Sequence, residues 1–235
     1  MEHRPLVIAH RGASAHATDN SLEAFALAVE HGADGIETDA RFTRDRQVVL
    51  SHDAVVPGVG VLAEIDLAGL RARRPAIPTL EEALPVTGNL LLNIEIKNFP
   101  RDPDFDPLHT MAEPMVGWID AHDLRERALV SSFNPDTVAR VRDLDDSIAT
   151  GLLLEHGRGI ADEIGNARAA GHRWIMPRSG AVRLRTRRLV ERVHLAGMKL
   201  GTWTVDRSSV LQSLGRAGID AVITNDPALA VEIYS

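Results

Sequence analysis

Residues 90–97 read LLLNIEIK, an apolar run that ends in Glu95 and Lys97. Such a run is typical of a strand that is buried on both faces of a parallel sheet. Residues 6–11, LVIAHR, and residues 35–40, GIETDA, have the same form, with charged side chains toward the end of each run. Parallel sheets place their ligand sites at the carboxyl ends of the strands. The three runs therefore predict a parallel sheet and the edge at which its chemistry occurs.

Short apolar runs alternate with helical patterns along the chain. Residues 20–32 carry apolar side chains at the i, i+3, i+4 and i+7 spacing of one helix face, and Asn20 with Glu23 has the spacing of a capping box. Thr79 and Glu82 form a second pair of this kind. Further strands are expected at residues 47–51, 128–131, 148–154, 173–176, 199–205 and 221–224.

This alternation predicts a closed (β/α)8 barrel, the TIM barrel. A chain of 235 residues with about eight βα units has the usual size of that fold. We expect a single catalytic barrel domain over residues 1–235, with a short insertion after the strand that ends at His52. A doubly wound sheet is the alternative, but the turn after the first strand, HRGAS at residues 10–14, lacks the G-x-G-x-x-G pattern of that fold.

The composition is that of an ordinary globular protein and excludes several classes. With 44% hydrophobic and 25% charged residues, the chain resembles neither a disordered segment nor a coiled coil. A formal net charge of −7 argues against nucleic-acid binding. The absence of cysteine excludes a disulfide framework, an iron–sulfur cluster and thiol catalysis. No signal peptide or membrane span is recognised, so we expect a cytoplasmic protein without stable membrane insertion, whose oligomeric state stays open.

Three carboxylates are expected to converge at the mouth of the barrel. Glu37 and Asp39 are two positions apart on one strand and therefore face the same way, and the same holds for the next pair, Glu95 and Lys97. Carboxylates held this close resist ionising together unless a cation lies among them. Oxygen ligands without cysteine favour Mg²⁺ or Ca²⁺. Arg11 and Lys97 beside such an ion suit a phosphate group.

Two histidines, His10 and His52, stand at the ends of predicted strands in the same region. Imidazole titrates near neutral pH, so this pair could share acid and base work, with either residue in either role. Asp53 follows His52 directly and is expected to point elsewhere, as a structural residue. Among the other histidines, His156, at the end of a predicted strand, is the one whose distance from the mouth is worth checking.

Nine short motifs together resemble a known family. They are AHRG at 9–12, DNSLEAF at 19–25, the Glu37-x-Asp39 pair, SHD at 51–53, IPTLEEAL at 77–84, NIEIK at 93–97, SSF at 131–133, GTWTVD at 201–206 and ITNDP at 223–227. In this order they resemble the glycerophosphodiester phosphodiesterase family, whose members are TIM barrels of the phospholipase-C-like kind. The resemblance runs nearly from end to end.

The resemblance implies an activity and a set of site residues. The activity is hydrolysis of glycerophosphodiesters to glycerol 3-phosphate and an alcohol with one divalent cation, Mg²⁺ or Ca²⁺, as expected in lipid and glycerol metabolism. The implied roles are metal ligands for Glu37, Asp39 and Glu95, general acid and base for His10 and His52, phosphate binding for Arg11 and Lys97, and a pocket wall for Phe133 and Trp203.

Four positions depart from the family's usual pattern, and one of them is Ser21, which stands where threonine is usual. Asp19 stands where glutamate is usual and is one methylene shorter, so its contact with Arg11 or His10 would need the loop to move inward. Arg46 replaces the glycine of a hairpin turn, and Asp206 replaces an asparagine.

Two other functions remain open from the sequence. One is a related diesterase that acts on lysolipids in the manner of lysophospholipase D, which would favour an apolar mouth. The other is a non-catalytic barrel that binds glycerol phosphate, for which the Asp19 and Asp206 departures are the motive.

Overall fold

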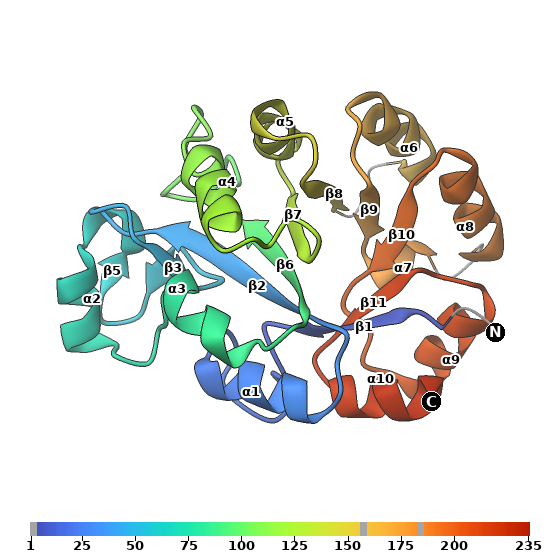
Figure 1. The fold of residues 1–235 in the computed structure, drawn as a ribbon, viewed down its shortest axis with the longest axis horizontal. Helices are drawn as coiled ribbons and strands as arrows, with labels where there is room; N and C mark the ends of the chain where they lie inside the picture. Colours follow the sequence, from blue (N-terminus) through green and yellow to red (C-terminus); the bar gives the residue numbers. More distant parts are fainter. Residues whose placement is uncertain (1–3, 156–158, 183–185) are drawn as a thin grey trace.

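A computed structural model describes residues 4–155, 159–182 and 186–235 as a (β/α)8 barrel (Figure 1). Within these residues, eight strands pair side by side in parallel, and β1 closes the ring by pairing with both β11 and β2. The barrel strands are β1 (Leu6–His10), β2 (Gly35–Phe42), β6 (Leu91–Ile96), β7 (Ala128–Ser132), β8 (Ala149–Leu154), β9 (Trp174–Pro177), β10 (Lys199–Thr202) and β11 (Ala221–Thr224). Closure confirms the predicted TIM barrel and excludes the doubly wound sheet.

Helices follow most of the barrel strands and surround them (Figure 1). They are α1 (Leu22–Glu30), α3 (Leu80–Ala83), α4 (Ala112–Ala121), α5 (Pro135–Leu144), α6 (Ile160–Ala169), α7 (Ser179–Val182), α8 (Thr186–Leu195), α9 (Ser208–Arg216) and α10 (Pro227–Tyr234), with a 3-10 turn η2 (Leu84–Val86) after α3. Thr79 and Glu82 form the predicted capping box at the start of α3.

The predicted short insertion follows β3 (Val48–Leu50), which runs antiparallel to β2, and ends before α3. It contains the hairpin of β4 (Val55–Val56) and β5 (Gly60–Val61), the 3-10 turn η1 (Leu62–Glu64) and helix α2 (Leu67–Arg73). Arg46 occupies the hairpin turn with φ of 60°, a left-handed conformation that glycine adopts more readily than other residues.

The start of α1 differs from the prediction. Ser21, not Asn20, caps the helix, because its hydroxyl accepts a hydrogen bond from the backbone N–H of Ala24. Asn20 instead adopts φ of 53° and is buried, with its side chain turned toward β2. The capping-box interpretation of Asn20 and Glu23 was therefore wrong, because a tertiary contact outcompetes the local one.

The interior of the barrel is packed below the site. Alternate residues of the strands point inward, and an apolar cluster that includes Ile8, Leu129, Leu153, Met176 and Ile223 fills the barrel. Cβ atoms at Gly151 and Gly201 would lie 2.5 and 3.1 Å from the Met176 side chain, so these glycines leave the space that it occupies. This layer forms the floor on which the polar residues of the mouth rest.

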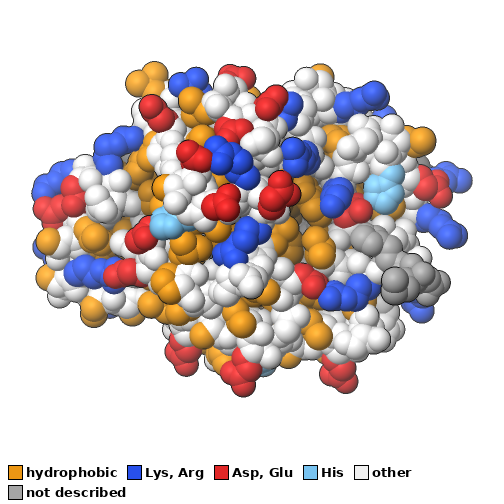
Figure 2. All heavy atoms as spheres, in the orientation of Figure 1, with side chains coloured by type: hydrophobic (Ala, Val, Ile, Leu, Met, Phe, Trp, Pro, Cys, Tyr) orange, Lys and Arg blue, Asp and Glu red, His pale blue; other side chains and the backbone are white. Residues whose placement is uncertain are grey.

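Among the described residues, no helix is long and apolar enough to cross a membrane. Lys, Arg, Asp and Glu side chains are interspersed on the face seen in Figure 2. The cytoplasmic location stays a prediction.

Candidate active site

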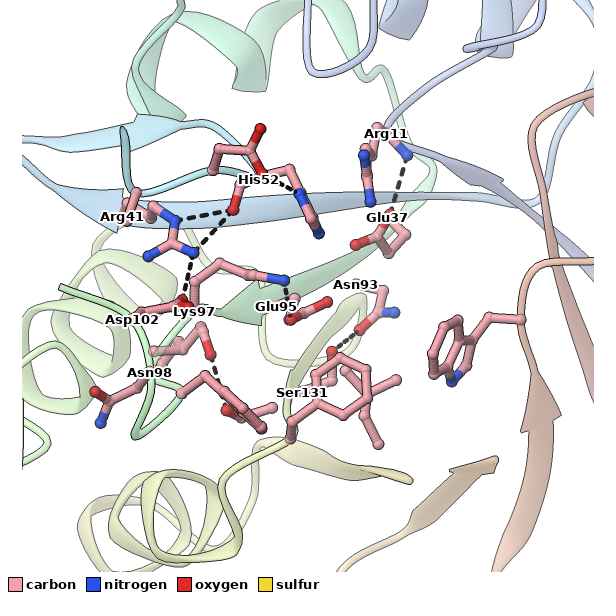
Figure 3. Close-up of a pocket in the computed structure, with 18 of the residues that line it drawn as sticks. Arg11, Glu37, Arg41, His52, Asn93, Glu95, Lys97, Asn98, Asp102 and Ser131 are labelled. Carbon is pink, nitrogen blue, oxygen red and sulfur yellow. Dashed lines mark hydrogen bonds and ion pairs between the residues drawn. The ribbon is translucent and has the colours of Figure 1, made fainter. Parts of the chain in front are cut away.

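Glu37, Asp39 and Glu95 form one buried acidic cluster. In the pairing of β2 with β6, Asp39 lies opposite Glu95. Glu37 is two positions before Asp39 on β2, so its side chain points inward from the same face of the strand. One carboxylate oxygen from each residue lies within 4.8 Å of the other two. The strand pairing thus brings together the three carboxylates that the spacing predicted (Figure 3).

Two cationic side chains lie against this cluster. Lys97 Nζ is 2.8 Å from Glu95 Oε1 and 3.5 Å from Asp39 Oδ1. Arg11 Nε is 3.1 Å from Asp39 Oδ2, and the Arg11 backbone N–H donates to Glu37 Oε2 at 3.0 Å. Arg11 makes this backbone contact with φ of 57°, in the left-handed region. Glu37 is the member of the cluster that contacts neither cationic head group.

The three carboxyl groups respond differently to this environment. Burial, together with the charges of Asp39 and Glu95, raises the pKa of Glu37 well above its usual range. Burial also raises the pKa of Glu95, although Lys97 opposes the shift. For Asp39, burial is outweighed by Lys97, Arg11 and a hydrogen bond from Asn20, so its pKa is lowered.

The acidic cluster fits a divalent cation. Three carboxylates face two cationic side chains, and Glu37 is the carboxylate whose charge is least compensated. The donor atoms are all hard carboxylate oxygens, the type that Mg²⁺ and Ca²⁺ prefer. The residues present therefore fit one such ion, but they do not identify which ion it is.

His10 reaches the cluster from the end of β1. Its Nδ1 lies 2.7 Å from Asn225 Oδ1, while Asn225 Nδ2 donates to Asp206 Oδ2 at 2.8 Å. Because that second bond fixes the Asn225 amide, its oxygen must accept from His10, so His10 Nδ1 carries a proton. His10 Nε2 lies 4.0 Å from Glu37 Oε2. Burial is the main cause that lowers the pKa of His10, and the charge of Arg11 adds to it, so the neutral ring is favoured.

His52 follows β3 and lines the same cavity. Its Nδ1 lies 2.7 Å from Asp53 Oδ1, and Arg41 holds its backbone carbonyl from Nε at 3.0 Å and from Nη2 at 2.8 Å. The prediction that Asp53 points elsewhere was wrong. Asp53 lines the same cavity, and its carboxylate orients the imidazole of His52. A carboxylate accepts only, so His52 Nδ1 also carries a proton and Nε2 is left for the cavity (Figure 3).

The predicted site residues surround a cavity of about 550 Å³ at the carboxyl ends of the strands. His10, Arg11, Glu37, His52, Glu95, Lys97, Phe133 and Trp203 line it, and Asp39 lies behind Arg11 and Lys97. Phe133 and Trp203 meet edge to face, with ring centroids 5.3 Å apart, and also pack against the apolar floor. His156 lies outside the described residues.

The departures at Asp19 and Asp206 both keep polar contacts. Asp19 Oδ2 accepts from Arg11 Nη1 at 3.1 Å despite its shorter side chain. Asp206 accepts from the Asn225 side chain and, at 2.8 Å, from the Asn225 backbone N–H.

Sequence reasoning missed several polar residues that support the site. Asn20 bridges Asp39 and Thr38, Asn225 orients His10, and Arg41 holds the His52 loop. A signal existed for Arg41, which continues the inward series of Glu37 and Asp39 on β2. Asn20 had a weaker signal, because asparagine is enriched among residues with positive φ.

The acidic cluster, two cationic side chains and two oriented histidines at the mouth of this (β/α)8 barrel form a site suited to the hydrolysis of phosphate esters. The model of the glycerophosphoryl diester phosphodiesterase family matches residues 10–229. The chain therefore belongs to this family and is a phosphodiesterase.

Known proteins similar to the chain agree with this assignment. The glycerophosphodiester phosphodiesterase of Caldanaerobacter subterraneus is 30% identical, with 98% of each chain covered. The probable glycerophosphodiester phosphodiesterase 2 of Mycobacterium tuberculosis is 32% identical, over 94% of this chain and 87% of the relative.

Solved structures share the fold. The glycerophosphodiester phosphodiesterase of Thermotoga maritima is similar with a TM-score of 0.82 at 24% identity, covering 99% of this chain and 100% of that one. An Oleispira antarctica phosphodiesterase, solved in complex with the product sn-glycerol-3-phosphate, is similar with a TM-score of 0.78 at 23% identity. The match covers 98% of this chain and 96% of that one.

Proposed function

We propose that this chain hydrolyses glycerophosphodiesters to glycerol 3-phosphate and an alcohol, and that residues 1–235 act as one catalytic domain. Family membership and the names of the relatives support this substrate. The observation that carries the proposal is the acidic cluster, flanked by Arg11 and Lys97 and approached by His10 and His52 in one cavity.

In this proposal Glu37, Asp39 and Glu95 hold one divalent cation, Mg²⁺ or Ca²⁺. When bound, such an ion supplies a lowered pKa for a coordinated hydroxyl or water and neutralises charge on the phosphate. Arg11 and Lys97 bind the phosphate oxygens and stabilise the charge that develops on them.

His10 and His52 exchange protons with the substrate through Nε2, since each ring is held through Nδ1–H. One ring accepts the proton of the nucleophile and the other protonates the departing alkoxide. Each such transfer contributes typically about 10² to 10⁴ in rate. Phe133 and Trp203 form the wall against which the substrate lies.

Two variants test the proposal directly. His10→Ala and Glu37→Ala should retain a folded barrel by circular dichroism and lose glycerophosphocholine turnover in a coupled glycerol 3-phosphate assay. His122→Ala, on a residue that contacts Glu81 outside the cavity, should keep the wild-type rate. Turnover at the wild-type rate in either cavity variant would refute the assignment, and tight glycerol 3-phosphate binding without any hydrolysis would support the non-catalytic barrel.

One observation favours a second candidate, a diesterase acting on lysolipids. A groove whose apolar side is formed by Phe99, Phe105 and Pro135 continues from the cavity, with which it shares Phe99, Phe133 and Glu155. Its other side is polar and includes Arg101 and Asp136. An acyl chain could lie along such an apolar wall. In the same assay, a higher kcat/KM for lysophosphatidylcholine than for glycerophosphocholine would favour this candidate.

A further inference from the structure

Asn93 is a buried amide with an unused donor in the floor of the cavity. Its side chain points inward from β6, two positions before Glu95, and the residue is 0% exposed. Ser131 Oγ donates to its Oδ1 at 2.9 Å, but no acceptor among the described residues lies within hydrogen-bonding distance of its Nδ2. Buried polar atoms almost always have partners, so this one calls for a ligand.

The orientation of the amide follows from its neighbours. Asn93 lies opposite Glu37 in the pairing of β2 with β6, and Glu95 is next on its own strand. These carboxylates favour the positive Nδ2 end, rather than Oδ1, on the cavity side. In Figure 3 the amide lies between Glu37 and Ser131, with its oxygen joined to Ser131 and its nitrogen turned away from it.

The position of Asn93 along β6 decides what it can contact. Asn93, Glu95 and Lys97 follow one another on the inward face, in steps of about 6.6 Å toward the mouth. The phosphate-binding cations Arg11 and Lys97 belong to the outer level. Asn93 belongs to the inner level, above the apolar side chains of the barrel floor.

A group that contacts Asn93 must reach the inner end of the cavity, where the apolar side chains of the barrel floor limit the space. The alcohol of a glycerophosphodiester varies in size between substrates and suits the open mouth, whereas the glycerol moiety is small and constant. We propose that Asn93 Nδ2 donates a hydrogen bond to a hydroxyl oxygen of the glycerol moiety, which makes Asn93 a specificity-determining residue. This inference rests on the proposed function and adds the orientation of the substrate, glycerol inward and alcohol outward.

The test compares binding of glycerol 3-phosphate with binding of its two deoxy analogues, 1,2-propanediol 1-phosphate and 1,3-propanediol phosphate, by calorimetry. Asn93→Ala should weaken the binding of glycerol 3-phosphate by about 10- to 100-fold, because one buried hydrogen bond is lost. For the analogue that lacks the contacted hydroxyl, Asn93→Ala and wild type should bind equally. Asn93→Ser serves the same purpose if the alanine variant does not fold.

Thr150→Val is the matched control, because Thr150 is a buried polar residue that pairs with His172 outside the cavity. Thr150→Val should bind glycerol 3-phosphate and both analogues with the affinities of the wild type. If Asn93→Ala weakens the binding of all three ligands equally, or of none of them, the inference is wrong. Glycerophosphocholine turnover by wild type, measured separately, reports on the proposed function, so failure of one claim is distinguishable from failure of the other.

Discussion

Glu37 bears the least compensated charge of the acidic cluster. Its carboxylate accepts from the Arg11 backbone, but the nearby side chains that affect it most are the carboxylates of Asp39 and Glu95. The protein thus holds a group whose charged form is disfavoured without a cation, a stability cost that is common at functional sites.

Glu37→Gln should therefore stabilise the metal-free protein, increasingly so as the pH rises. The pKa of Glu37 is raised on folding, so above the unfolded value of about 4.3 the unfolded state releases a proton that the folded state retains. The wild type accordingly loses stability relative to Glu37→Gln as the pH rises from about 4.3 toward the raised pKa. Urea unfolding in EDTA should give a difference of about 1–2 kcal/mol at pH 8 and nearly none at pH 4.5.

Glu30→Gln, on an exposed glutamate of α1, is the control and should change the free energy of unfolding little at any pH. A difference between Glu37→Gln and wild type that does not vary with pH, or that has the opposite sign, would contradict this account of Glu37.

Some residue roles could be predicted from the sequence and others could not. The period of two along a strand was enough to place Glu37 and Asp39 together. Asn20 was misassigned because its capping signal is local, whereas its partners Thr38 and Asp39 come from another element. Adjacent residues can also meet, as His52 and Asp53 do, because both lie in a loop and not in a strand.

At the scale of elements, Arg41 ties three segments of the barrel together. From β2 its guanidinium holds the His52 carbonyl after β3, and it pairs with Asp102 and Asp104 in the loop after β6. Arg41 is 2% exposed and Asp104 is nearly as buried, so the pair is shielded from water. The same loop carries Phe99 and Asp102 to the cavity wall.

Arg41→Met should cost about 3–5 kcal/mol in unfolding free energy, because it leaves the buried Asp104 carboxylate without its partner. Arg44→Met breaks the exposed pair with Asp66 and should cost less than about 1 kcal/mol. Adding Asp104→Asn to Arg41→Met should restore part of the loss. Urea denaturation measures all three, and an Arg41→Met cost no larger than that of Arg44→Met would refute the role.

At the scale of the whole molecule, the fold followed from the alternation of strands and helices. That alternation predicts parallel pairing, and eight units allow closure. The side chains that support the site are harder to predict, since Asn225 and His10 are 215 positions apart and meet only because β1 and β11 pair. Long-range pairing of this kind is set by the closed barrel and leaves no local pattern in the sequence.

The central claim is that Glu37, Asp39 and Glu95 hold one divalent cation that glycerophosphodiester hydrolysis requires. The most direct test strips the protein of metal and titrates Mg²⁺ or Ca²⁺ back while glycerol 3-phosphate release from glycerophosphocholine is followed. The account predicts no turnover after stripping and recovery that saturates at one bound ion per chain. Undiminished turnover by the fully stripped protein would contradict it.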